Sequence, residues 1–157
     1  MLDLETVDVH ARPMLYLSRR SGMDPEAIAK TMAEGFATMG SFIGTEHITP
    51  AGPPLAIYSD WSGTEMKVQI GFPVATPDLA KARGDIAAGQ TPSGRSLKAL
   101  HHGPYSKLRQ TYATLEKHFA KAHASMPALT WENYVTDPDT TPEADLVTEI
   151  YMPLPDA

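Results

Sequence analysis

Two short segments rich in aromatic and β-branched residues lie near the end of the chain, at Trp131–Val135 and Leu146–Met152. The stretch between them contains two prolines and four acidic residues, so the pattern predicts two β-strands joined by a long polar loop. Each predicted strand carries a glutamate followed two residues later by a tyrosine: Glu132 with Tyr134, and Glu149 with Tyr151. Side chains two residues apart share one face of a strand. A carboxylate is unusual in a strand and needs a partner when it is buried, so this hairpin predicts a polar, aromatic surface.

The composition limits what the whole chain can be. With 157 residues, one domain over 1–157 is expected, and it is long enough to bury a sizeable core. The absence of cysteine excludes disulfides and thiolate metal ligands. A net charge of −6 argues against a nucleic-acid-binding surface along the chain. No apolar run approaches the roughly 20 residues of a membrane span, and the acidic amino terminus is not typical of a signal peptide. We therefore expect a soluble, cytoplasmic protein without a nucleic-acid partner.

The predicted elements occur twice in the same order, strand–helix–strand–strand, over about 4–74 and about 95–153. In the first unit, extended segments at 4–9 and 14–18 precede a helix that begins at Asp24–Pro25, a favourable N-cap and first helical residue. Strands at 55–61 and 65–74 follow it. The second unit has a strand at 95–102, a helix after Gly103–Pro104, and then the hairpin. Residues 75–94 are expected to connect the two units, with one helical turn.

Each predicted helix has one apolar stripe and is expected to pack on a small antiparallel sheet. The stripes are Ile28, Met32, Phe36, Met39 and Ile43 in the first helix, and Leu108, Tyr112, Leu115, Phe119 and Ala122 in the second. Two such units side by side predict an α+β fold with two helices on one face of the sheet and an open, concave ligand cleft on the other. We expect Glu132 and Tyr134 on this open face, opposite Leu108, Tyr112 and Phe119.

Three segments of the chain carry a family resemblance: GFPV at 71–74, HHGPYSKLRQTYATLEKHF at 101–119 and WENYVTDPDTTPEADLVTEIYMPL at 131–154. With the duplicated β-α-β-β order, they resemble the GyrI-like domain, also called the gyrase-inhibitor-like or AraC effector-binding domain. The resemblance spans nearly the whole chain and is to the stand-alone members. It implies a pocket between the two repeats that binds drug-like, often cationic, aromatic compounds. The family's pocket glutamate falls on Glu132.

The candidate ligand-binding residues are Glu132, Tyr134, Trp61, Tyr105, Tyr58 and Glu149. An acidic group in an aromatic cavity attracts a delocalised cation by Coulomb attraction and by cation–π contact. Each candidate also has a structural interpretation. Glu132 could pair with Lys98 or Arg95, Glu149 with a neighbouring strand, and strand aromatics are commonly core residues.

Three functions remain open on the sequence alone. The first is a binding protein that sequesters or senses amphipathic aromatic compounds. The second is a hydrolase that opens strained, cyclopropane-type rings of genotoxic natural products, a reaction that the resemblance implies for a subset of the family. Glu132 and Tyr134 would then be catalytic, because a carboxyl with apolar walls has a raised pKa and can act as a general acid. The third is a module that binds a protein partner.

The histidines do not form a convincing metal site. His101 and His102 are adjacent, so on a strand they point to opposite faces. His118 and His123 are five residues apart, outside the spacing by which two helical histidines share a metal. Glycine-rich nucleotide-binding motifs are also lacking. We therefore expect no metal and no cofactor.

Overall fold

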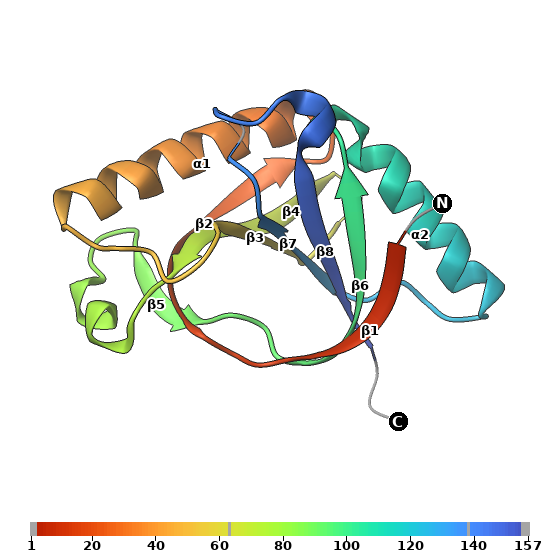
Figure 1. Ribbon diagram of the computed structural model, residues 1–157, viewed down its shortest axis with the longest axis horizontal. Coiled ribbons are helices and arrows are strands. Elements are labelled where there is room, and N and C mark those ends of the chain that lie inside the picture. The colour runs from red at the N-terminus through yellow and green to blue at the C-terminus, as the bar shows by residue number, and fades with distance from the viewer. Residues whose placement is uncertain (1–2, 63, 138, 155–157) are drawn as a thin grey trace.

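The computed structural model describes residues 3–62, 64–137 and 139–154. They form an eight-stranded antiparallel sheet with the strand order β1-β6-β8-β7-β3-β4-β2-β5 (Figure 1). The strands are β1 (Asp3–Val9), β2 (Pro13–Gly22), β3 (Leu55–Ser59), β4 (Glu65–Pro73), β5 (Ala87–Gln90), β6 (Gly94–His102), β7 (Leu129–Tyr134) and β8 (Val147–Pro153). The helices are α1 (Pro25–Thr45) and α2 (Leu108–Lys121), with short 3₁₀ segments η1 (Thr76–Lys81), η2 (Tyr105–Lys107) and η3 (Glu143–Asp145).

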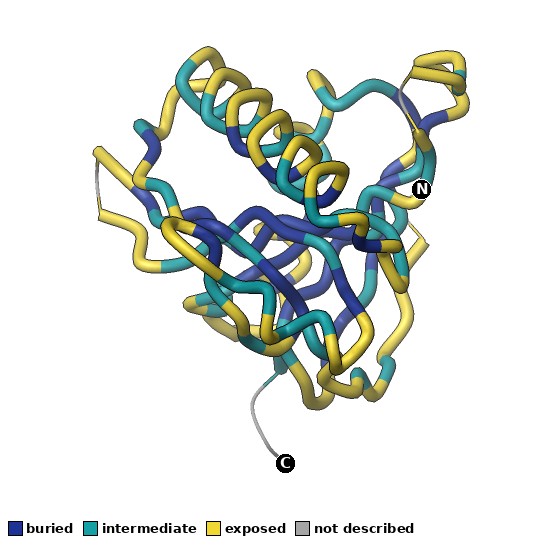
Figure 2. The backbone as a smooth tube through the Cα atoms, turned by 90° about the vertical axis from the view of Figure 1, so that its left-hand side faces the viewer, coloured by how far each residue is buried: buried dark blue, intermediate teal, exposed yellow. Residues whose placement is uncertain are grey.

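Helix α1 begins where the sequence predicts it. The carboxylate of Asp24 accepts a hydrogen bond from the backbone N–H of Ala27 at 3.0 Å, and Pro25 occupies the first turn. The apolar stripe of α1 packs on one half of the sheet, in a cluster that includes Leu15, Leu17, Met39, Ile43, Ala56, Val68 and Ile70. Figure 2 shows the buried sheet beneath this helix, whose outward-facing side is exposed.

Helix α2 covers the other half of the sheet. Its buried residues Leu115 and Phe119 belong to a cluster with Leu97, Ala99, Ile150 and Met152. Both helices lie on the same face, because Ala56 in the α1 cluster and Ile150 in the α2 cluster are register partners of the same β7 residue, Glu132. The α+β fold, with an antiparallel sheet and two helices on one face, is confirmed.

The face opposite the helices is not the open surface that the sequence pattern predicted. Met14, Leu55, Ile57, Trp131 and Tyr151 form a buried apolar cluster there. Val7 and Val9 of β1 pack against this cluster, and the chain from β1 to β2 curves around the lower edge of the sheet in Figure 1. The indole of Trp131 stacks on the ring of Tyr151, with 4.1 Å between ring centroids. This concave face is therefore a second core.

The order of elements repeats, but two strands depart from the predicted units. The segment at 4–9 does not lead the first unit, because β1 pairs with β6 in the second half of the chain. The connector at 75–94 contains the expected helical turn as η1, and also β5, which pairs with β2. The repeats are therefore β2-α1-β3-β4 and β6-α2-β7-β8, and they join where β3 pairs with β7.

Candidate functional site

Glu132 lies in β7, at the junction of the two repeats. Ala56 of β3 is its register partner on one side and Ile150 of β8 on the other. Its side chain is on the face covered by the helices, and only 2% of the residue is exposed. The expectation that Glu132 is partly exposed on the face opposite α2 is wrong. Because side chains alternate along β7, Trp131 and Asn133 take the concave face, and Glu132 is buried under the helices.

Three tyrosine hydroxyls surround the Glu132 carboxylate. Tyr134 donates to Oε1 at 2.6 Å, Tyr58 donates to the same oxygen at 3.3 Å, and Tyr112 donates to Oε2 at 2.5 Å. The hydroxyls of Tyr58 and Tyr134 are 3.2 Å apart. We call these four residues the Glu132 cluster. They come from β3, β7 and α2, so the cluster links both repeats.

Burial and hydrogen bonding act in opposite directions on the Glu132 carboxyl. Burial raises its pKa above the usual 4.5, and the hydrogen bonds from the three tyrosines, together with the charge of nearby His101, partly offset this rise. The pKa values of these tyrosines are raised well above 10, first by burial and then by the charge of Glu132. The tyrosines therefore stay protonated at neutral pH and act as hydrogen-bond donors to the carboxyl.

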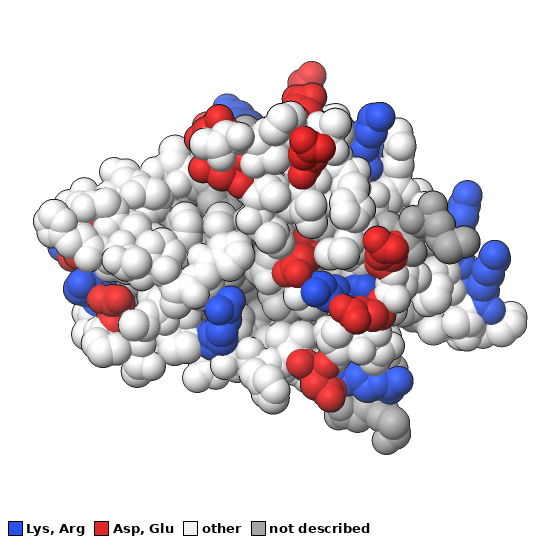
Figure 3. Space-filling view, viewed as in Figure 1, with Lys and Arg blue, Asp and Glu red and all other residues white. Residues whose placement is uncertain are grey.

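The Glu132 carboxylate has no basic partner among the ion pairs of the described residues. Lys98, which the structural alternative paired with Glu132, instead approaches Glu149 at 3.1 Å and Glu5 at 3.8 Å. On the face seen in Figure 3, acidic and basic side chains are interspersed rather than gathered in one acidic patch. The acidic group best placed to bind a cation is therefore the buried one.

Aromatic rings from both helical regions extend the cluster. Phe36 of α1 contacts the ring of Tyr134 edge-on at 5.5 Å, and Tyr105 of η2 contacts it at 5.7 Å. Phe36 also contacts Phe72 edge-on at 6.4 Å. Such rings present flat apolar surface and negatively polarised faces, which suit an aromatic or cationic ligand.

A surface pocket of about 490 Å³ opens beside these rings. Tyr134 lies in its wall, together with Pro53, Pro54, Phe72, Val135, Thr136 and Asp137. The wall from Val135 to Asp137 belongs to the loop between β7 and β8, and Thr136 Oγ1 accepts a hydrogen bond from the backbone N–H of Val147 at 3.0 Å. Tyr134 thus lines the pocket and also donates to Glu132, so it belongs to both the pocket and the Glu132 cluster.

His101 fixes the start of the α2 region beside the cluster. Its Nε2 lies 3.0 Å from the carbonyl oxygen of Pro104, which can only accept, so Nε2 carries a proton. Its Nδ1 lies 2.7 Å from the hydroxyl of Thr111. His101 is buried, whereas the adjacent His102 is exposed. Among the described residues, no group of three or more potential ligands is arranged to hold a metal.

Two predicted site residues lie away from the cluster. Trp61 is 39% exposed and follows β3 on the side away from the pocket, five residues or roughly 16 Å along the chain from Ala56. Glu149 lies on the concave face, because its register partner in β7 is Asn133 rather than Glu132. It accepts hydrogen bonds from Asn133 at 3.3 Å and Tyr151 at 3.1 Å. The two glutamate–tyrosine pairs of the hairpin therefore belong to opposite faces of the sheet.

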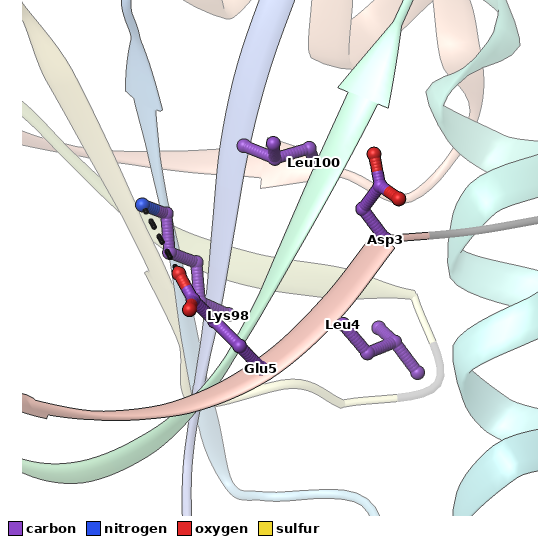
Figure 4. Close-up of a pocket in the computed structure, with 5 residues that line it drawn as sticks. All are labelled: Asp3, Leu4, Glu5, Lys98 and Leu100. Atoms are coloured by element: carbon purple, nitrogen blue, oxygen red, sulfur yellow. Dashed lines mark ion pairs between the residues drawn. The ribbon is translucent and has the colours of Figure 1, made fainter.

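A smaller pocket of about 230 Å³ lies between β1 and β6 (Figure 4). It is lined by Asp3, Leu4, Glu5, Lys98 and Leu100. The ion pair of Lys98 with Glu5 crosses it, and Leu4 is exposed. The charge of its only basic group is thus already paired, and aromatic surface is lacking, so this pocket is a weaker candidate than the one beside Tyr134.

Tyr112 is the site residue that the sequence pattern did not identify. Its place in the apolar stripe of α2 predicted a core residue, yet its hydroxyl donates to Glu132. Met32 and Phe36 of α1 likewise belong to a predicted core stripe, but Met32 Sδ lies 3.7 Å from the hydroxyl of Tyr58 and Phe36 contacts the ring of Tyr134. The signal for Tyr112 was its hydroxyl, because a tyrosine on a buried stripe needs a hydrogen-bond partner.

Comparison with known proteins identifies the family. The model of the GyrI-like small-molecule-binding domain matches residues 3–155. The chain belongs to the GyrI-like family. This match confirms the resemblance that the HGPY segment and the carboxy-terminal hairpin indicated. No curated protein matches the sequence at a significant level.

Solved structures of low sequence identity share the GyrI-like fold. The C-terminal domain of EcmrR is 19% identical, with a TM-score of 0.79 and 100% of this chain and 99% of that chain covered. SAV2435 bound to tetraphenylphosphonium is 14% identical, with a TM-score of 0.64 and coverage of 96% and 93%. A hydrolase encoded by lin2189 from Listeria innocua is 13% identical, with a TM-score of 0.57 and coverage of 96% and 91%.

The described part of this GyrI-like domain offers two kinds of chemistry at one place. A buried carboxylate that forms no ion pair can bind a cation, and the same carboxyl, with its raised pKa, can donate a proton. No helix of the described residues is long and apolar enough to cross a membrane.

Proposed function

We propose that this GyrI-like domain binds aromatic cations between α1 and α2, with Glu132 as the counter-charge. The observation that carries the proposal is the burial of Glu132 among neutral hydroxyls, without an ion pair in the described residues; His101 is the basic group that acts on it from nearby. An ionised carboxylate in such a place is costly, because hydrogen bonds replace only part of its hydration. A ligand cation supplies the missing charge.

The pocket beside Tyr134 is the proposed entrance. Tyr134 lines this pocket and donates to Glu132, so a movement of Tyr134 would open a path from the pocket to the carboxylate. The rings of Phe36, Tyr105 and Tyr134 then supply stacking and cation–π contacts. The shared fold with SAV2435, whose structure holds tetraphenylphosphonium, supports a ligand of this chemistry.

Titration of the purified protein with tetraphenylphosphonium, followed by isothermal calorimetry, tests the proposal directly. We expect saturable binding of one cation per chain. Crystals grown with the cation should show it in contact with Phe36 and Tyr134. The absence of saturable binding to this and other aromatic cations would reject the proposed function.

The affinity for the cation is expected to rise with pH. Burial raises the pKa of Glu132 above 4.5, so the carboxyl is protonated at acidic pH and binds a cation less strongly. Affinity should increase as the pH passes through this raised pKa and level off above it. Calorimetric titrations from pH 4 to pH 8 measure the trend, and Glu132→Gln should abolish it. A pH profile that the variant leaves unchanged would assign the titration to another group.

The stability of the unliganded domain is expected to change in the opposite direction. A pKa that is higher in the folded than in the unfolded state favours the fold at low pH, and this contribution is lost as the pH rises through the folded value. Glu132→Gln should therefore gain stability relative to the wild type as the pH rises from 4 to 8. Urea unfolding at each pH measures this difference. A gain for the variant that is greatest at pH 4 would contradict the raised pKa.

A second candidate function is hydrolysis, favoured by the raised pKa of Glu132 next to Tyr134. For a spirocyclopropyl cyclohexadienone, the carboxyl would protonate the carbonyl oxygen while water attacks the ring. A C–C bond of the cyclopropane breaks, a C–O bond forms, the attacking water gives a proton back to the Glu132 carboxylate, and the product is a hydroxyethyl phenol. Multiple turnovers by the wild type, lost in Glu132→Gln, would show an enzyme. Stoichiometric binding without product would leave only the binding function.

A further inference from the structure

Two hydroxyl groups beside Tyr134 lack hydrogen-bond partners in the described structure: Tyr105 Oη and Thr148 Oγ1. Thr148 is fully buried and is the register partner of Tyr134 across β7 and β8. The ring of Tyr105 contacts the ring of Tyr134 edge-on. Tyr105 and Thr148 therefore both neighbour Tyr134, the residue that lines the pocket and donates to Glu132.

Neighbouring polar groups do not satisfy these hydroxyls. The tyrosines of the Glu132 cluster direct their hydroxyls to the carboxylate, and His101 uses both ring nitrogens on Thr111 and Pro104. Buried hydroxyls are almost always hydrogen-bonded in folded proteins, and an unpaired one is destabilising. Trp131 Nε1 and Asn133 Oδ1 on the concave face are also unpaired, but of the four such atoms in the described residues only the two hydroxyls lie beside the proposed ligand site.

We propose that the ligand carries a neutral hydrogen-bond acceptor, a carbonyl or hydroxyl oxygen, which pairs with Tyr105 and Thr148 while its aromatic cation lies against Glu132. The proposal rests on the function proposed above and narrows its ligand class. The acceptor is neutral because the carboxylates of Glu132 and Asp137 lie near it. Asp137 lines the pocket, and its charge acts on the Tyr105 hydroxyl, so an anionic group would be repelled.

Two tetraarylphosphonium cations of nearly identical shape test this assignment. (4-Acetylphenyl)triphenylphosphonium has a carbonyl oxygen where (4-isopropenylphenyl)triphenylphosphonium has a methylene group. Both carry the same charge and similar apolar surface. We expect the wild type to bind the acetyl compound about three- to tenfold more tightly than the isopropenyl compound, because one or two additional hydrogen bonds contribute about this much to affinity.

Thr148→Val removes one proposed donor with little change of shape. It should bring the affinity for the acetyl compound down about threefold or more and leave the affinity for the isopropenyl compound unchanged. Tyr105→Phe should reduce the preference for the acetyl compound in the same way. A variant that loses the preference while retaining the isopropenyl affinity assigns the effect to the hydrogen bond.

A matched threonine variant tests whether the Thr148 hydroxyl is unpaired in the unliganded fold. Thr91 is also buried, but its hydroxyl accepts the backbone N–H of Arg12 at 2.8 Å. Thr91→Val should lower the midpoint of thermal unfolding, whereas Thr148→Val should leave it unchanged or raise it. A clear decrease for Thr148→Val would show that its hydroxyl is already satisfied, and would overturn the proposal.

The outcomes separate this inference from the function on which it rests. Binding of both cations with equal affinity rejects the acceptor and leaves the aromatic-cation site in place. A preference that persists in Thr148→Val and in Tyr105→Phe also rejects the assignment of these residues. Failure of both cations to bind the wild type rejects the proposed function and this inference together.

Discussion

Glu132→Gln is expected to weaken binding of methyltriphenylphosphonium by roughly 100-fold, about 2.7 kcal/mol, and to change binding of neutral triphenylphosphine oxide by less than about threefold. The two compounds have similar shape, but the oxide is neutral and has an acceptor oxygen in place of the methyl group, so each compound is compared with itself between the two proteins. Glutamine removes the negative charge and keeps one acceptor oxygen for the tyrosine hydroxyls, while its amide nitrogen replaces the second acceptor by a donor. Because the site is buried, the lost Coulomb attraction is weakly screened and salt should change the effect little. Calorimetric titration of both compounds against both proteins measures the difference.

Glu149→Gln is the matched control for this result. Glu149 is in the strand next to Glu132, but its side chain is on the concave face and paired with Lys98. The same chemical change there should leave the affinity for the cation within about twofold of the wild type. Equal losses for the two variants, or equal losses for the cation and the neutral oxide in Glu132→Gln, would remove the electrostatic role of Glu132.

The sequence predicted much of the frame because the frame depends on local patterns. The alternation of β4, the apolar stripe of α1 and the Asp24–Pro25 start each follow from neighbouring residues. The same holds for the carboxy-terminal hairpin, in which β7 and β8 occur close to the predicted segments. The resemblance to the GyrI-like family added Glu132 as the residue around which to build the site.

The face on which Glu132 lies could not be read from the same patterns. Alternation shows that Glu132 and Tyr134 share a face, but it does not show whether the helices cover that face or the one with Trp131. A carboxylate suggested the exposed face, whereas three tyrosine hydroxyls make its burial possible. Tyr58 and Tyr112 come from distant parts of the chain, so their contact with Glu132 depends on strand order and helix placement.

The pairing of β1 with β6 could not be predicted from local sequence patterns either. The segment at 4–9 is close in sequence to β2, and only the curvature of the sheet brings it to the opposite edge. This pairing closes the concave face over Trp131 and Tyr151, which is why that face holds a second core instead of a cleft. Because the concave face is filled, the candidate ligand site lies on the face that the helices cover.

Gly71→Ala is expected to lower the free energy of unfolding by about 3 kcal/mol, a large part of the stability of a typical domain. Gly71 lies in β4, opposite Tyr16 of β2 and Leu55 of β3. A Cβ at this position would overlap the backbone carbonyl oxygen of Leu15 and approach Tyr16 Cβ at 2.8 Å. Backbone cannot move aside as a flexible side chain can, so the pairing of β2 with β4 must shift. Urea unfolding followed by circular dichroism measures the loss.

Gly40→Ala supplies the contrast, because the same methyl group meets nothing within 4 Å in the exposed part of α1. Alanine favours a helix over glycine by up to about 1 kcal/mol, so this variant should be more stable than the wild type. Gly35→Ala should fall between the two, since its methyl group meets the end of the Ile70 side chain, which can change rotamer. Equal stabilities for Gly71→Ala and Gly40→Ala would mean that the sheet accommodates a side chain at Gly71. The close approach of β4 to β2 would then not be what requires glycine in the GFPV segment.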